Sequence, residues 1–144
     1  MNCESLGEMK FFIPMKKLPT ATDQEKSINT KTKQVYLKPE AKEARAMLRA
    51  YLSRHAPEKP FMKVPLFVKV VWCFPITGKH YDGEPKITKP DTQNMNKALY
   101  DVMTELGFWD DDARICEEHI CKIYSRTPGL YIRIEIIDEV EGKR

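Results

Sequence analysis

The sequence predicts an α+β domain in which two helices pack on a mixed β-sheet, and three observations lead to this fold class. The chain has 144 residues, of which 42% are hydrophobic and 31% are charged, as expected for one folded domain over residues 1–144. Apolar residues recur with a period of two in some segments and of three to four in others. The predicted elements follow the order strand, helix, strand, helix, strand, strand.

The first strand is predicted over residues 9–14, MKFFIP, after a loose extension over residues 1–8. Residues 15–36 are polar and have no steady period, which indicates a long loop. A helix is predicted from Pro39, which suits the first helical position and is followed by apolar residues at the spacing of a core-facing stripe. A second stripe on this helix is basic, and it is either a solvated face or a ridge that holds phosphates. It consists of Lys38, Lys42, Arg45 and Arg49.

The middle of the chain predicts a strand, a loop and a second helix. Residues 66–74, LFVKVVWCF, are mostly β-branched, aromatic or otherwise apolar, which indicates a central buried strand. Residues 77–90 are basic and rich in turn-forming residues, so we expect a hairpin or loop there. The second helix is predicted over residues 94–106, with apolar residues on one face and Gly107 as its stop.

Two antiparallel strands are predicted to complete the domain, over residues 115–124 and 130–137, with the turn 125–129 between them. In the later strand every second residue from Leu130 onward is apolar, which indicates its buried face. Residues 139–144 are expected to form a frayed tail.

Neither an export signal nor a membrane span is expected. The longest apolar stretch, residues 64–76, is interrupted by Pro65 and Lys69. The four cysteines follow no disulfide-framework spacing, which favours reduced thiols in a cytosolic protein.

The net charge of +3 hides a difference between the two parts of the chain. Residues 1–100 contain 18 Lys and Arg against 10 Asp and Glu, a net charge of +8, whereas residues 101–144 contain 6 against 11, a net charge of −5. A basic first part can hold a polyanion, and an acidic last part can hold a metal ion or repel the wrong ligand. Charge alone is equally compatible with a mixed surface that binds no polyanion.

Carboxylates around the second predicted helix are the best candidates for chemistry. Asp91, at the helix start, is either an N-terminal cap or a functional carboxylate. Lys97 and Asp101, four residues apart, fit an ordinary surface ion pair. The three consecutive aspartates 110–112 repel one another, and a divalent cation such as Mg²⁺ would offset that repulsion. A solvated acidic turn is the alternative interpretation.

Helix geometry limits how these carboxylates can meet. A helix over residues 94–106 would be about 20 Å long, and the five steps from Gly107 to Asp112 can return at most about 18 Å. Asp91 and Asp112 therefore share a site only if the chain runs back along the helix, if the helix is shorter, or if a second subunit completes the site.

Residues 89–115, KPDTQNMNKALYDVMTELGFWDDDARI, resemble the signature of the RusA family of Holliday-junction resolvases. That signature has an Asp-x-Asp-Asn-Leu-x-Lys segment, an Asp four residues later, and Gly-Phe-Trp followed by paired aspartates. Weaker similarity to RusA-type proteins of phage and prophage origin extends over most of the chain. The resemblance implies a RusA-like fold, a homodimer, four-way junction DNA as the substrate and Mg²⁺ or Mn²⁺ as the cofactor.

The resemblance also implies roles for individual residues. Asp91, Lys97 and Asp112 would be catalytic, and the lysine would stabilise charge on the phosphate or help to position the attacking water. The implied metal ligands are Asp91, Gln93, Asp111 and Asp112. Independently of the resemblance, the basic stripe and the basic loop over residues 77–90 are expected to hold DNA phosphates through Lys38, Lys42, Arg45, Arg49, Lys79, Lys86 and Lys89.

Gln93 departs from the family pattern, because it stands where the family has a second aspartate. Its amide oxygen can ligate a metal, but it brings no charge and cannot act as a general base. Two functions therefore stay open: a metal-dependent endonuclease that makes paired cuts in junctions, and a junction-binding protein with weakened or lost catalysis. A third possibility is an α+β interaction module without affinity for DNA.

Two competing motifs are less favoured. Pro90-Asp91 together with residues 141–143, EGK, imitates another nuclease superfamily, but the second element lies in the expected tail. Cys116, His119 and Cys121 suggest zinc, yet on a strand Cys116 points away from the other two. Buried cysteines and an edge histidine are the favoured interpretation.

Overall fold

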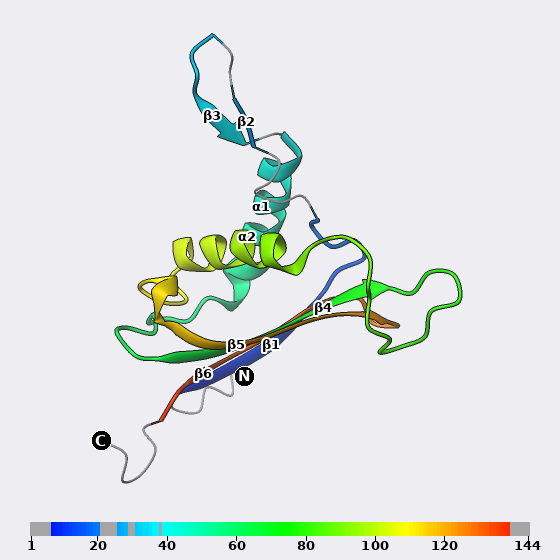
Figure 1. Ribbon diagram of the computed structural model, residues 1–144. Coiled ribbons are helices and arrows are strands. Elements are labelled where there is room, and N and C mark those ends of the chain that lie inside the picture. Colours follow the sequence, from blue (N-terminus) through cyan, green and yellow to red (C-terminus); the bar gives the residue numbers. More distant parts are fainter. Residues whose placement is uncertain (1–6, 21–25, 29–30, 38, 139–144) are drawn as a thin grey trace.

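The computed structural model describes residues 7–20, 26–28, 31–37 and 39–138. In this part of the chain a four-stranded mixed sheet carries two helices on one face, which confirms the α+β prediction (Figure 1). The elements are β1 (Glu8–Pro14), β2 (Lys26–Ile28), β3 (Val35–Leu37), α1 (Pro39–Leu52), β4 (Leu66–Pro75), α2 (Thr92–Glu105), β5 (Ile115–Ser125) and β6 (Gly129–Ile136), with the short 3-10 helices η2 (Ser53–His55) and η3 (Asp112–Arg114).

The sheet order is β1-β6-β4-β5. β4 pairs with β5 in parallel and with β6 in antiparallel orientation, so the prediction of a central buried strand is confirmed. Leu66, Val68, Val70 and Trp72 alternate along β4 and are all fully buried. They form the core together with apolar side chains of both helices and of β6.

The last two strands run antiparallel as predicted, but they are not neighbours. β4 lies between β5 and β6, which places β5 at an edge of the sheet. The reason is the β4-α2-β5 connection: a helical crossover brings the following strand back parallel to the first. β6 then pairs with the other side of β4 and with β1.

Some predictions outside the central strands and helices need correction, and others fall on residues that the structure does not describe. Glu8 belongs to β1, because the main chain of Gly7 already accepts a hydrogen bond from Ile136. The predicted loop over residues 15–36 includes β2 and the start of β3, which pair antiparallel, and Lys33 just before β3 has a φ of 57°. Residues 1–6, 38 and 139–144 lie outside the described residues, and so does the competing EGK motif.

The two helices contact each other on one face of the sheet, and they cross in the view of Figure 1. Leu48 and Leu52 of α1 and Leu99 and Val102 of α2 are buried in the shared core. α2 begins two residues earlier than predicted, because Asp91 caps its first turn. No helix among the described residues is long and apolar enough to cross a membrane.

Candidate active site and DNA interface

Asp91 stands at the N-terminus of α2 on the wall of a cavity. One of its carboxylate oxygens accepts a hydrogen bond from the main chain of Gln93 at 2.8 Å, so the helix cap anticipated from the sequence is present. The side chain remains exposed and lines a cavity of about 920 Å³. Gln93 is exposed and does not line this cavity.

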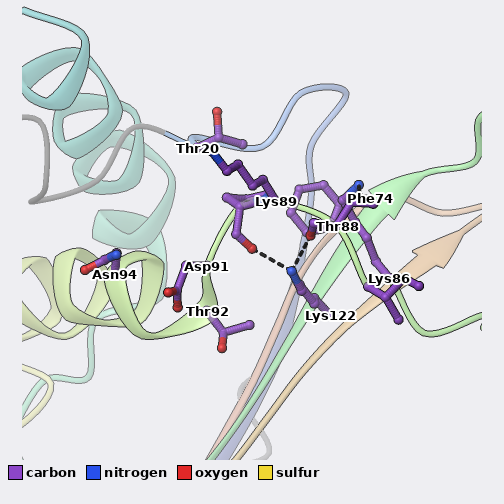
Figure 2. A pocket seen from close by; sticks show the side chains of 11 residues that line it. Thr20, Phe74, Lys86, Thr88, Lys89, Asp91, Thr92, Asn94 and Lys122 are labelled. Carbon is purple, nitrogen blue, oxygen red and sulfur yellow. Dashed lines mark hydrogen bonds between the residues drawn. The ribbon is translucent and has the colours of Figure 1, made fainter.

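Three lysines line the same cavity: Lys86, Lys89 and Lys122 (Figure 2). Lys122 projects from β5 and donates hydrogen bonds to the main-chain oxygens of Thr88 and Pro90, the second at 2.7 Å. It therefore ties the segment that leads into α2 to the edge of the sheet. Its half-buried ammonium and the other two amines make this cavity suitable for an anion.

The three consecutive aspartates have different surroundings. Asp110 forms a two-pronged ion pair with Arg114, with a shortest distance of 2.8 Å, which lowers the pKa of Asp110 to about 2. Asp111 accepts a hydrogen bond from the main chain of Ala113 at 2.8 Å and caps η3. Partial burial raises the pKa of Asp112, and the negative charges of Asp101 and Asp111 raise it further. Asp112 is thus the carboxylate of this run whose ionised form is disfavoured by its surroundings.

A tyrosine and a glutamate complete the acidic end of α2. The hydroxyl of Tyr100 donates to Glu118 of β5 at 2.6 Å. Burial raises the pKa of Tyr100, with contributions from the charges of Glu118 and Asp112. The hydroxyl therefore stays protonated and links the acidic group to the edge strand.

The basic ridge predicted on α1 is largely occupied by contacts with α2. Arg45 pairs with Asp101 at 3.1 Å and its side chain is only 12% exposed. Arg49 pairs with Glu105 at 2.8 Å. Lys42 is exposed, and Lys38 lies outside the described residues. Among the described residues of this ridge, Lys42 is therefore the one best placed to contact DNA.

The sequence profile of the family Endodeoxyribonuclease RusA matches residues 17–135. This chain belongs to the RusA family. A curated relative, the crossover junction endodeoxyribonuclease rusA of Lactococcus phage r1t, is 30% identical over 128 residues. The alignment covers 88% of this chain and 97% of the phage protein.

The RusA signature is spread along the whole length of α2. Asp91 stands at one end, while Asp112 lies close enough to Asp101 for their charges to interact. Ten residues separate Asp91 from Asp101, which corresponds to about 15 Å along the helix axis. Lys97 lies between them and is exposed.

The metal ligands implied by the RusA resemblance do not converge in one copy of the chain. Among the described residues, no three carboxylate, histidine or cysteine side chains are grouped so that they could hold a metal ion. Asp111 and Asp112 are together at one end of α2, and Asp91 and Gln93 are at the other. The donor chemistry suits a hard divalent cation, but the set is incomplete in a single copy.

The zinc alternative is likewise without a ligand group among the described residues. His119 lies on an edge strand, as expected, but Cys116 is exposed rather than buried. Cys116 lies in the first part of β5, where residues 116–119 are all exposed.

Reasoning from the sequence missed Lys122, Tyr100 and Glu118. Glu118 and Lys122 are four residues apart on β5, so they lie on the same face of the strand, toward α2. This shared face follows from the strand predicted over residues 115–124. Their partners could not be known, because the pairing depends on how α2 crosses the sheet.

Proposed function

We propose that this RusA-family protein is a metal-dependent endodeoxyribonuclease that resolves four-way DNA junctions by paired phosphodiester hydrolysis. The family match and the named activity of the phage relative support this proposal. The observation that carries it is the presence of Asp91 and three lysines in one cavity. A DNA phosphate held by the lysines would lie beside a carboxylate of the signature.

Different residues along α2 and beside it have different roles in the proposed reaction. Lys86, Lys89 and Lys122 hold phosphates at the N-terminal end, with Lys79 and Lys42 as outer contacts. Lys97 stabilises charge that develops on the scissile phosphate. Asp112, whose pKa is raised, is suited to accept a proton from the attacking water.

We propose a homodimer as the active form, because a four-way junction is nearly two-fold symmetric and two symmetric cuts require two sites. A dimer also offers a second set of acidic residues to the incomplete ligand set in each copy. Mg²⁺ or Mn²⁺ is the proposed cofactor, since both ions prefer oxygen ligands.

The second candidate function is a junction-binding protein that cuts poorly. It is favoured by Gln93, which supplies no charge, and by the absence of three grouped metal-ligating side chains in the described part of the chain. In this alternative the lysine-lined cavity would still hold phosphates.

The deciding experiment measures junction cleavage with Mg²⁺ and with Mn²⁺, and junction binding in parallel with Ca²⁺. We expect cleavage by the wild type and loss of cleavage, with binding retained, for Asp112→Asn. Glu117→Gln is the matched control, because it removes one exposed carboxylate from β5 outside the proposed site. Binding without cleavage in either metal would favour the second candidate, and no binding would reject both.

A further inference from the structure

An isoleucine is displayed to solvent on the loop between β4 and α2. Ile87 is 93% exposed, compared with 65% for Tyr81 and 55% for Met62, the other exposed large hydrophobic side chains of the described residues. Figure 1 shows this loop extending past the end of β4. Scattered exposed apolar residues need no explanation by themselves, so the surroundings of Ile87 decide whether it has a role.

The backbone on both sides of Ile87 is fixed to β5. The main-chain nitrogen of Lys86 donates to the oxygen of Lys122 at 3.0 Å, and the ammonium of Lys122 donates to the oxygen of Thr88 (Figure 2). The ammonium of Lys86 also donates to the hydroxyl of Thr88 at 2.9 Å. Both neighbours are thus engaged with the protein, and the fold itself holds Ile87 outward.

The side chain next to Ile87 is also fixed. The ammonium of Lys86 lies 5.2 Å from the ring centre of Phe74 and 5.0 Å from that of Tyr124. These cation–π contacts limit the movement of the loop at this point. An apolar side chain on an ordered loop can insert into a partner with a smaller loss of backbone entropy on binding.

The partner that fits this loop is a nucleic acid. Ile87 lines the cavity that also contains Lys86, Lys89 and Lys122, so a phosphate held there would bring the adjoining bases next to an isoleucine. Proteins that bend DNA frequently insert apolar side chains, isoleucine among them, between base steps and partly unstack the bases. A membrane surface fits less well, because one isoleucine gives little insertion into a bilayer.

We infer that Ile87 is a wedge that enters the base stack at the branch point of four-way DNA, where fewer stacking contacts must be broken. The inference rests on the proposed function and adds a residue that distinguishes branched from linear DNA. Ile87 would contribute to junction preference, whereas the lysines contribute to affinity for any DNA.

The test uses a four-way junction with 2-aminopurine beside the branch point, because the fluorescence of this base rises when it unstacks. Ile87→Ser should lose most of the fluorescence rise that the wild type causes, and Ile87→Leu should retain it. The preference for junction over linear duplex should fall about tenfold in Ile87→Ser, the size expected for one large apolar side chain. Met62→Ser is the matched control, since Met62 is exposed but precedes β4, at the opposite end of that strand.

Several results would overturn the inference. A full fluorescence rise with Ile87→Ser, in a wild type that cuts junctions, would reject the wedge and leave the proposed function intact. Loss of a sedimenting dimer in Ile87→Ser would make this side chain a contact between copies. Weaker binding of Ile87→Ser to phosphatidylserine vesicles, with unchanged junction binding, would assign it to a membrane surface. If the wild type neither binds nor cuts junctions, the proposed function itself fails.

Discussion

Arg45 of α1 pairs with Asp101 of α2 across the helix interface, with 3.1 Å between guanidinium nitrogen and carboxylate oxygen. Asp101 is also one of the two carboxylates whose charge raises the pKa of Asp112. The arginine predicted to contact DNA therefore lies at the back of the acidic group, where it neutralises one of its members. This relationship links the packing of the two helices to the electrostatics of the candidate site.

Arg45→Ala should destabilise the protein by about 1–3 kcal/mol, because it leaves a half-buried Asp101 without its partner. Urea unfolding measures this change. Arg49→Ala is the control, since both members of its ion pair are well exposed and such pairs contribute only about 0–1 kcal/mol. Equal losses from the two substitutions would show that the Arg45 pair has no special structural role.

Lys122→Ala should weaken junction binding and reduce the slope of log affinity against log salt by about one. The substitution removes a cation from the cavity and releases the main chain of Thr88 and Pro90. Fluorescence anisotropy over a range of salt concentrations gives the slope. Lys10→Ala, on the opposite edge strand β1, should leave the slope unchanged. Similar slopes for Lys122→Ala and the wild type would remove Lys122 from the DNA interface.

Asp112→Asn should make the protein more stable near neutral pH. A carboxyl with a raised pKa in the folded state binds its proton more tightly there than in the unfolded chain, so its ionisation lowers stability as pH rises above the usual value of 3.8. The amide removes this cost. Unfolding by urea at several pH values should therefore show a gain that grows from acidic to neutral pH. A gain independent of pH would contradict this account of Asp112.

Gln93→Asp should raise the rate of junction cleavage and lower the Mg²⁺ concentration that is needed. It adds a charged oxygen ligand at the position where the family has an aspartate, and hard cations are held mainly by carboxylates. Cleavage titrated with Mg²⁺ checks this result. An unchanged Mg²⁺ dependence, with Asp112→Asn inactive, would place position 93 outside the metal site.

Gly129→Ala should destabilise the fold by about 2 kcal/mol or more. Gly129 has a φ of 155°, and an added Cβ would lie 2.2 Å from the main-chain oxygen of Ile13 on β1. Thermal or urea unfolding measures the loss. Gly83→Ala is the control, because Gly83 also has a positive φ, at 90°, but has open space around it. A smaller loss for Gly129→Ala than for Gly83→Ala would mean that β1 adjusts to the added atom.

The sequence by itself determined most elements and the family signature. The continuous apolar run of β4, the apolar stripes of the two helices and the cap at Asp91 are local features, and each was predicted within a few residues of its observed bounds. They are readable because a period of two or of 3.6 residues and a capping side chain act over one or two turns of chain. The separation of Asp91 from Asp112 could also be inferred from the sequence, because it follows from the length of one helix.

Only the tertiary structure decided which distant residues meet. It placed β4 between β5 and β6, turned Arg45 toward Asp101, brought Asp101 beside Asp112, and joined Lys122 to the loop that displays Ile87. Partners far apart in sequence leave no periodic trace in either segment. Their contacts depend on how the crossover through α2 places the edge strand β5 next to the helices. This placement follows from the packing of the whole chain.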